Sequence, residues 1–213
     1  MRSWILACSI LAAISTLAQH SPDTTTPRTC LFSQFREGTV LQKNGTIATA
    51  QLNYNTENQT FLFKQNGQNM ILTGLDNIDT IYIEEKKFIP AEDKFYLVAT
   101  ATEFPLLISY TYKPIPLQAQ AEHTGTSRRT SNVVSNNVSE AYLSRRYQGQ
   151  YDIAFIPQFW LMRGHSLYKA NTEKQIARAL PQKETLISEY IRNNKPDLRR
   201  EKDVIDLIRF CQQ

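Results

Sequence analysis

The chain has 213 residues, of which 41% are apolar and 21% are charged. This ordinary globular composition excludes a chain that is disordered throughout. Lys and Arg exceed Asp and Glu by only 24 to 20, and with 7 Gly and no sustained heptad repeat the chain is neither collagen-like nor a coiled coil.

Residues 1–18 have the three parts of a secretory signal peptide. Arg2 supplies the positive charge, residues 4–17 are mostly apolar, and small residues favour cleavage after Ala18. The apolar run is shorter than a membrane-spanning helix requires, and Cys8 lies in its middle rather than at its end, where lipidation would occur. The sequence therefore predicts an exported protein that is periplasmic, envelope-associated or secreted, with no transmembrane segment in the mature chain. A retained membrane anchor and a lipidated Cys8 are the alternatives.

Residues 19–29 predict a polar spacer, and residues 30–112 predict an antiparallel β-rich domain. Apolar and polar residues alternate over residues 47–54, and Asn44-Gly45 and Asn66-Gly67 each separate two such segments, which is typical of tight hairpins. Strands recur about every eight to twelve residues, which indicates a small sandwich or a partly closed barrel.

Residues 113–140 predict a polar, flexible linker. We expect Pro114 and Pro116 to end the preceding strand, and the residues that follow are rich in Thr, Ser, Asn and Gln. Such a composition buries too little apolar surface to offset the entropy lost on ordering. Arg128-Arg129 would offer trypsin a cleavage site there.

Residues 141–213 predict a β-hairpin followed by a three-helix tail, which makes the fold class α+β. Strand-like segments flank a turn at Arg163-Gly164-His165. Thr172 and Gln175 have the spacing of a capping box, so we expect the first helix to begin there. Pro181 predicts the start of the second helix, Asn193-Asn194 its left-handed end, and the last helix is expected over residues 199–210.

Two cysteines would remain after signal cleavage, which is an even number in an oxidising compartment. Cys30 opens the β-rich domain and Cys211 follows the apolar stripe of the last helix. A disulfide between Cys30 and Cys211 is one interpretation. Two buried thiols are the other, because Cys also packs as a small apolar residue.

Two stretches carry a resemblance. The first combines Phe35, Gly38, Val40 and Lys43-Asn44-Gly45 with Leu52-Asn53-Tyr54-Asn55, and the second combines Ala179-Leu180-Pro181 with Tyr190-Ile191 and Leu207-Ile208. Together they resemble a group of uncharacterised exported bacterial proteins, in which a β-rich N-terminal segment precedes a short helical C-terminal tail. The resemblance implies export and this order of elements, and it carries no catalytic residues.

The sequence contains none of the common catalytic or metal-binding motifs. The sequence has no HExxH, GxSxG, P-loop, GxGxxG or CxxC motif, so it assigns no catalytic residue, no metal ligand and no cofactor. His165 beside Ser166 is a weak candidate for a dyad, and an exposed turn histidine is the competing interpretation. The carboxylates of Asp76 and Asp79, or of Glu84 and Glu85, are candidates for binding Ca²⁺. The simpler interpretation is that they are solvated acidic residues of turns.

Two aromatic groups are the remaining candidates for a ligand site. Asn53-Tyr54-Asn55 suggests either a small-ligand or glycan site or, more simply, a core tyrosine between asparagines that form strand-end turns. Tyr151 with Phe159-Trp160 suggests either an exposed aromatic platform or core packing. The ligand-binding residues stay unknown at this level.

These observations favour an exported, non-catalytic envelope protein that acts as a binding or interaction module. Its expected partner is another envelope protein or a surface polymer. Nucleic acid is excluded as a partner because the basic excess of residues 113–213, 16 basic against 10 acidic, is dispersed in short pairs. The alternatives are an envelope hydrolase with an unrecognised site and a structural protein that docks through its helical tail.

Overall fold

The structure is a computed structural model that describes residues 26–117, 140–147 and 149–212. The predicted signal peptide, Ala18, most of the predicted spacer and residues 118–139 of the predicted linker lie outside the described residues. No helix in the described ranges is both long enough and apolar enough to cross a membrane.

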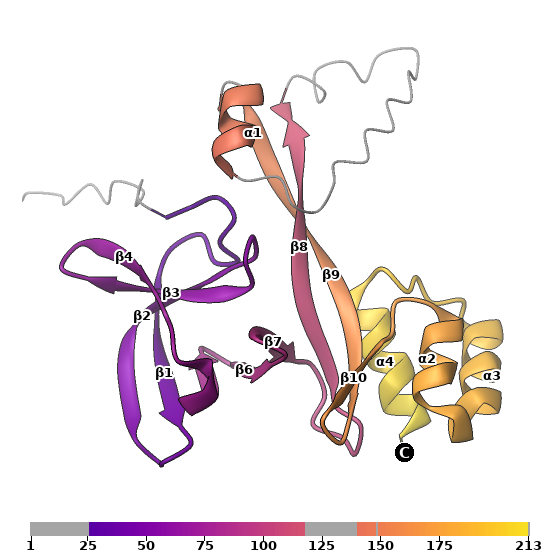
Figure 1. The fold of residues 1–213 in the computed structure, drawn as a ribbon. Coiled ribbons are helices and arrows are strands. Elements are labelled where there is room, and N and C mark those ends of the chain that lie inside the picture. Colours follow the sequence, from indigo (N-terminus) through magenta and orange to yellow (C-terminus); the bar gives the residue numbers. More distant parts are fainter. Residues whose placement is uncertain (1–25, 118–139, 148, 213) are drawn as a thin grey trace, which may run out of the picture.

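Ten strands form one antiparallel sheet in the order β10-β9-β8-β7-β6-β5-β1-β2-β3-β4, which is the sheet-rich α+β class that the sequence predicts (Figure 1). The strands are β1 (Arg36–Gln42), β2 (Ile47–Asn55), β3 (Thr60–Gln65), β4 (Gln68–Ile71), β5 (Ile78–Ile83), β6 (Lys86–Ala91), β7 (Lys94–Val98), β8 (Leu106–Pro116), β9 (Tyr151–Arg163) and β10 (Ser166–Lys169). A short 3-10 helix, η1 (Leu75–Asn77), precedes β5. The sheet therefore joins strands from both sides of the predicted linker.

Both expected hairpins are present, but the first turn is longer than the two residues predicted at Asn44-Gly45, because the amide of Gln42 donates to the carbonyl of Thr46 and leaves three residues between them. Asn66 and Gly67 join β3 to β4 with positive φ angles of 51° and 76°, which is the backbone that a two-residue turn between antiparallel strands requires. Gly45 has a φ of 85° in the turn between β1 and β2. Both turns thus rest on residues that adopt left-handed conformations at low cost.

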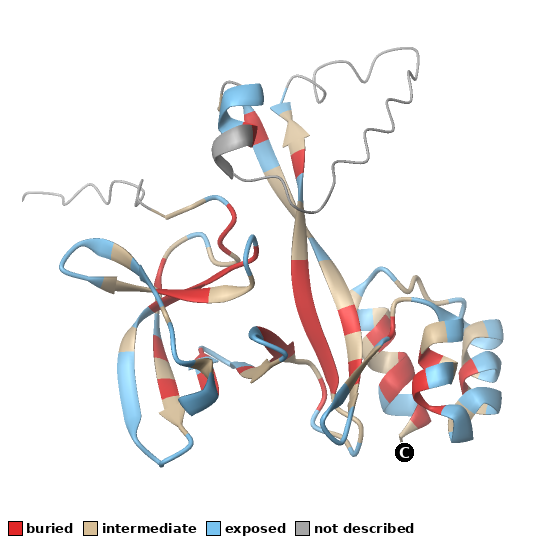
Figure 2. Ribbon diagram, viewed as in Figure 1, coloured by how far each residue is buried: buried red, intermediate tan, exposed pale blue. Residues whose placement is uncertain are grey.

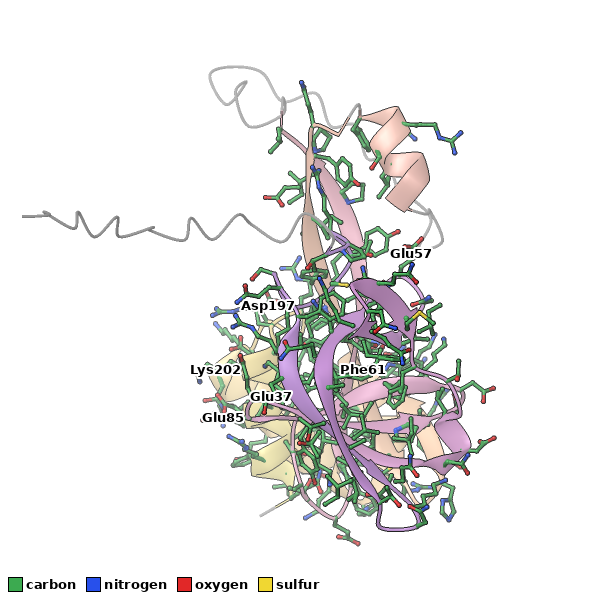
Figure 3. All side chains as sticks on the ribbon, turned by 90° about the vertical axis from the view of Figure 1, so that its left-hand side faces the viewer. Glu37, Glu57, Phe61, Glu85, Asp197 and Lys202 are labelled. Carbon is green, nitrogen blue, oxygen red and sulfur yellow. The ribbon has the colours of Figure 1, made fainter. Side chains whose placement is uncertain are left out.

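The sheet curls so that β3 approaches β7. The amide of Phe95 in β7 donates a hydrogen bond of 3.2 Å to the carbonyl of Gln59, just before β3. The hydroxyl of Tyr54 in β2 donates to the carbonyl of Phe95 at 3.0 Å. The aromatic rings of Tyr54, Phe61, Phe88 and Phe95 pack inside the curl at centroid separations between 5.0 and 5.5 Å, and Phe61 is labelled among these side chains in Figure 3.

Three helices follow β10 and pack against the sheet. They are α2 (Glu173–Ala179), α3 (Glu184–Asn194), which follows the 3-10 turn η3 (Pro181–Lys183), and α4 (Glu201–Cys211). Their buried residues belong to the same apolar cluster as the inner residues of the curl, and Figure 2 shows buried residues on these helices and on the lower part of β8. The core is therefore continuous from the curled strands to the helical tail.

The helix boundaries agree with the sequence in part. Thr172 caps α2, because its hydroxyl accepts the amide of Gln175 at 3.3 Å. The side chain of Gln175 accepts the amide of Asn171 at 2.9 Å, so it reaches one residue before the cap. The end of α3 differs from the prediction: Lys195, with a φ of 47°, takes the left-handed position expected of the asparagines before it.

The most prominent departure from the sequence prediction is the length of β8. The strand does not stop before the prolines, since β8 runs through Pro114 to Pro116 and pairs with β9 as far as Tyr151. The two strands form a long ribbon whose upper end rises beyond the rest of the sheet, beside the short helix α1 (Glu140–Arg146) (Figure 1). We call the part of this ribbon from Thr111 to Pro116 and from Tyr151 to Ile156 the arm.

Candidate binding groove

A groove of about 570 Å³ lies between the arm and the N-terminal segment of the described chain. One wall is the segment 26–33, which we call the strap, and the other is the edge of β9. The lining is largely apolar and consists of Thr26, Pro27, Arg28, Cys30, Leu31, Phe32, Ser33, Leu117, Gly149, Tyr151, Asp152, Ile153 and Phe155. Its size is within the range of ligand-binding clefts.

Arg28 fastens the strap to the arm at one end of the groove. Its guanidinium donates hydrogen bonds to the carbonyls of Gly149 at 2.9 Å and Tyr151 at 2.8 Å. The guanidinium carbon also lies 4.8 Å from the centre of the Tyr151 ring. Because guanidinium is planar and carries several donors, one side chain both stacks on the ring and bridges two carbonyls.

Asn53 fastens the strap to the curled sheet at its other end. The side-chain amide of Asn53 donates to the carbonyl of Phe32 at 2.8 Å, and its oxygen accepts the amide of Phe32 at 3.2 Å. The hydroxyl of Thr56 donates to the carbonyl of Thr29 at 2.7 Å. Asn53 and Thr56 are both buried, so these bonds are shielded from water and hold the strap firmly.

The hydrogen-bond alternation of the ribbon determines which backbone groups of β9 point away from β8. Two hydrogen bonds fix this alternation at the two ends of the β8–β9 ladder. The amide of Met162 donates to the carbonyl of Pro105 at one end, and the amide of Leu117 donates to the carbonyl of Gln150 at the other. The register between them is uninterrupted. Hydrogen-bonded pairs alternate with non-hydrogen-bonded pairs in an antiparallel ladder. The N–H and C=O groups of residues 151, 153, 155 and 157 therefore point outward, toward the edge of β9.

Three of these outward groups are occupied from within the chain. The carbonyl of Tyr151 accepts from Arg28, the amide of Ile153 donates to the carboxylate of its neighbour Asp152 at 2.9 Å, and Pro157 has no N–H. The carbonyl of Pro157 accepts from the side chain of Gln158 at 3.1 Å. Both ends of this edge are thereby closed to another strand.

Three outward groups between those ends stay open. No donor or acceptor within residues 26–117, 140–147 and 149–212 pairs with the carbonyl of Ile153 or with the N–H and carbonyl of Phe155. Ile153 and Phe155 both line the groove. The residues that line the groove therefore include a short piece of strand edge with one donor and two acceptors that point away from β8.

The opposite edge of the arm, along β8, is protected by proline. By the same alternation, Pro114 and Pro116 lie at positions whose N–H would point outward, and proline has none. Proline at such positions removes donors from an edge without breaking the ladder inside the ribbon. This explains why the strand continues through residues that we expected to end it.

Comparison with known proteins adds no identification: no family model, no curated protein and no solved structure matches the chain. The assignment of function therefore depends on the groove and on the sequence.

The pKa values that shift most belong to core residues away from the groove. Burial, and secondarily the nearby Tyr96, raises the pKa of the Tyr54 hydroxyl well above its usual range. Burial and then the Glu201 carboxylate at the start of α4 do the same to the pKa of Tyr110. Burial raises the pKa of the Cys211 thiol to about 11. Each shift favours the neutral form of a group inside the core.

The weak catalytic candidate is not assembled. His165 and Ser166 are exposed at the turn between β9 and β10, where Ser166 lies opposite Arg163 in the ladder. No hydrogen bond joins these two side chains, both of which the structure describes. The histidine is thus an exposed residue of a turn, the simpler of the two interpretations.

The acidic candidates for Ca²⁺ are spread out. The carboxylate of Asp79 accepts the hydroxyl of its neighbour Thr80 at 2.9 Å, and Glu84 lies 3.5 Å from the guanidinium nitrogen of Arg36. Across the described ranges, no three or more His, Cys, Asp or Glu side chains gather as a metal site would require.

The aromatic candidates are mainly structural. Tyr54 and Phe159 lie in the core, and the oxygen of Asn55 accepts the amide of Glu57 at 2.9 Å, which makes the strand-end turn that we expected. The buried ring of Tyr151 supports Arg28. Trp160 stays partly exposed on the other face of the ribbon, where its indole donates to Ser109 at 3.1 Å.

The two cysteines are buried thiols in different parts of the core. Cys30 packs with Phe35 and Leu62, whereas Cys211 belongs to the large cluster beneath the helical tail. The disulfide stays a prediction for the mature protein, and counting thiols on the denatured, non-reduced protein decides it. Two thiols match the structure, and none in a monomer would establish the bond.

The groove itself was not predicted from the sequence. The sequence places residues 26–29 of the strap in the polar spacer and residues 30–33 in the β-rich domain, and it places Pro114 and Pro116 in the linker. The signal was present in the spacing of Pro114 and Pro116, because prolines two residues apart on one strand protect one edge. It becomes readable only once the pairing of β8 with β9 is known.

Proposed function

We propose that the protein is an exported, non-catalytic binding module that holds a polypeptide partner in the groove between the strap and the arm. The observation that supports this most strongly is that Ile153 and Phe155, whose outward backbone groups have no hydrogen-bond partner save the amide of Ile153, also line an apolar groove. Exposed strand edges bind extended chains readily, and natural proteins usually cover them.

The lining of the groove favours binding over chemistry. Its charged side chains are Arg28, which already bridges two backbone carbonyls, and Asp152, which accepts the neighbouring amide. Its thiol, Cys30, is 4% exposed. Apolar walls with few polar groups suit an extended peptide better than a reacting small molecule.

The location of the protein is part of the proposal. The charged start, apolar run and small residues of residues 1–18 support export, and the resemblance to exported bacterial proteins supports the same compartment. A partner in the bacterial envelope follows from this, as a periplasmic, surface-exposed or secreted polypeptide.

We also infer that β1–β3 and β5–β7 form a partly closed barrel. The hydrogen bond from Phe95 to Gln59 and the packed rings of Tyr54, Phe61 and Phe88 support this arrangement. Such a body gives the strap a rigid anchor at Asn53, so one wall of the groove stays in place when a partner enters.

Site-specific photo-crosslinking tests the binding proposal in the native host. A photoreactive phenylalanine analogue at Phe32, in the groove, is expected to give one discrete adduct. The same analogue at Tyr82, which is 41% exposed and absent from the groove lining, serves as the matched control. Equal adducts at both positions, or none at Phe32, would overturn the proposal.

A further inference from the structure

We propose that the partner binds the groove as an extended strand that pairs with the edge of β9 at Ile153 and Phe155. This rests on the proposed function and specifies its binding mode and the kind of partner. The added strand would accept the N–H of Phe155 and donate to the carbonyls of Ile153 and Phe155.

The length of the open edge limits the length of the added strand. Arg28 covers the carbonyl of Tyr151 at one end, and the edge ends at Pro157, which lacks an N–H, at the other. Five residues lie between these two positions, and a strand rises roughly 3.3 Å per residue, so the edge accommodates about 16 Å of extended chain. A segment of about five residues fits between the two closed ends.

The side chains around the open edge set the composition of that segment. Leu31 and Phe32 of the strap and Leu117, which directly follows β8, line the groove together with Ile153 and Phe155. Alternate side chains of an added strand point to the same face. We therefore expect apolar residues at alternate positions of the partner and polar residues between them.

Several other outward positions of the ribbon either lack a donor or are already hydrogen-bonded, which distinguishes them from Ile153 and Phe155. Prolines remove the outward donors at positions 114, 116 and 157 of the same ribbon. Phe159, the next outward position beyond Pro157, is occupied, since its amide donates to the side chain of Asn171 and its carbonyl accepts the amide of Ala170. Phe155 keeps its donor where the groove provides space for a second chain.

A substitution pair at one position separates the backbone contact from the side-chain contact. Phe155→Pro removes the outward N–H and the ring, whereas Phe155→Ala removes the ring alone. Because Phe155 lies at a non-hydrogen-bonded position opposite Tyr112, proline there leaves the ladder between β8 and β9 intact. Amide exchange of Ala154 and Ile156 in each variant checks that the arm has kept its pairing.

The probe is a capped pentapeptide of alternating valine and threonine, titrated by calorimetry into the protein purified after expression of the full chain. We expect the peptide to bind, and Phe155→Pro to bind about tenfold more weakly than Phe155→Ala, since one backbone hydrogen bond is lost. Equal affinity of the two variants, or no binding of the peptide to the unchanged protein, would overturn strand addition. A discrete crosslink at Phe32 in either case would leave the proposed function standing with another binding mode.

Discussion

The guanidinium of Arg28 lies over the ring of Tyr151 at 4.8 Å and donates to the carbonyl of that same residue at 2.8 Å. One side chain thus holds a segment near the start of the described chain against a strand that follows more than a hundred residues later. The contact closes one end of the groove and fixes the distance between its walls.

Replacing Arg28 by lysine is expected to loosen the strap while keeping the charge. A lysine ammonium cannot stack flat on the ring and bridge two carbonyls at once, so about 1 kcal/mol of local stability is lost. Amide exchange over residues 26–32 should become roughly fivefold faster. Arg145→Lys, at an exposed position in α1, is the control and should leave that exchange unchanged.

Asn53→Ala is expected to lower the free energy of unfolding by about 2 kcal/mol, because it leaves the N–H and C=O of Phe32 without their partner. Asn55→Ala loses only the turn contact with the amide of Glu57 and should cost less than half as much. Urea denaturation followed by tryptophan fluorescence measures both. Similar losses in the two variants would contradict the anchoring role of Asn53.

Gly38→Ala is expected to destabilise the curled sheet by about 1–3 kcal/mol through overpacking. An added Cβ would lie 2.8 Å from both the Leu52 side chain and the Tyr82 carbonyl. The neighbouring strand offers a control in Thr49→Ala, whose exposed side chain should matter by less than about 0.5 kcal/mol. Thermal denaturation of the two variants should separate them, and an unchanged melting temperature for Gly38→Ala would count against this packing.

Stability is expected to fall between pH 9 and pH 11 because of Cys211. Burial raises the pKa of this thiol from its usual 9.0 to about 11, so the unfolded chain ionises first. The contribution of the neutral Cys211 thiol to the free energy of unfolding is complete below pH 9. It is lost as the pH rises toward 11, by roughly 2–3 kcal/mol in total. Cys211→Ala should show a decline that is smaller by about that amount. Parallel declines in the two proteins would exclude this assignment.

The sequence predicted the local elements well because their signals are local. Asn66-Gly67 and the alternation before Tyr54 indicate strands and turns without knowledge of distant residues, and Thr172 identifies the start of α2 in the same way. Lys195 shows the limit of such signals, since the left-handed residue that ends α3 is Lys195 and not Asn193 or Asn194, as the sequence predicts.

The groove could not be predicted because it depends on pairings between distant residues. Arg28 and Tyr151 are separated by 123 positions, and no local pattern links them. Pro114 reads as the end of a strand until its partner in β9 is known, and only the register shows that its missing N–H faces outward. Asn53 likewise reads as a turn former until the strap lies beside it.

Residue-resolved amide exchange along β9 tests the central claim most directly. The register assigns Ala154 and Ile156 to hydrogen-bonded pairs with Lys113 and Thr111, and it assigns Phe155 to the edge. In the protein without a partner, NMR should therefore find slow exchange at Ala154 and Ile156 and fast exchange at Phe155 between them. Protection of Phe155 equal to that of its two neighbours would contradict the open edge and the binding mode built on it.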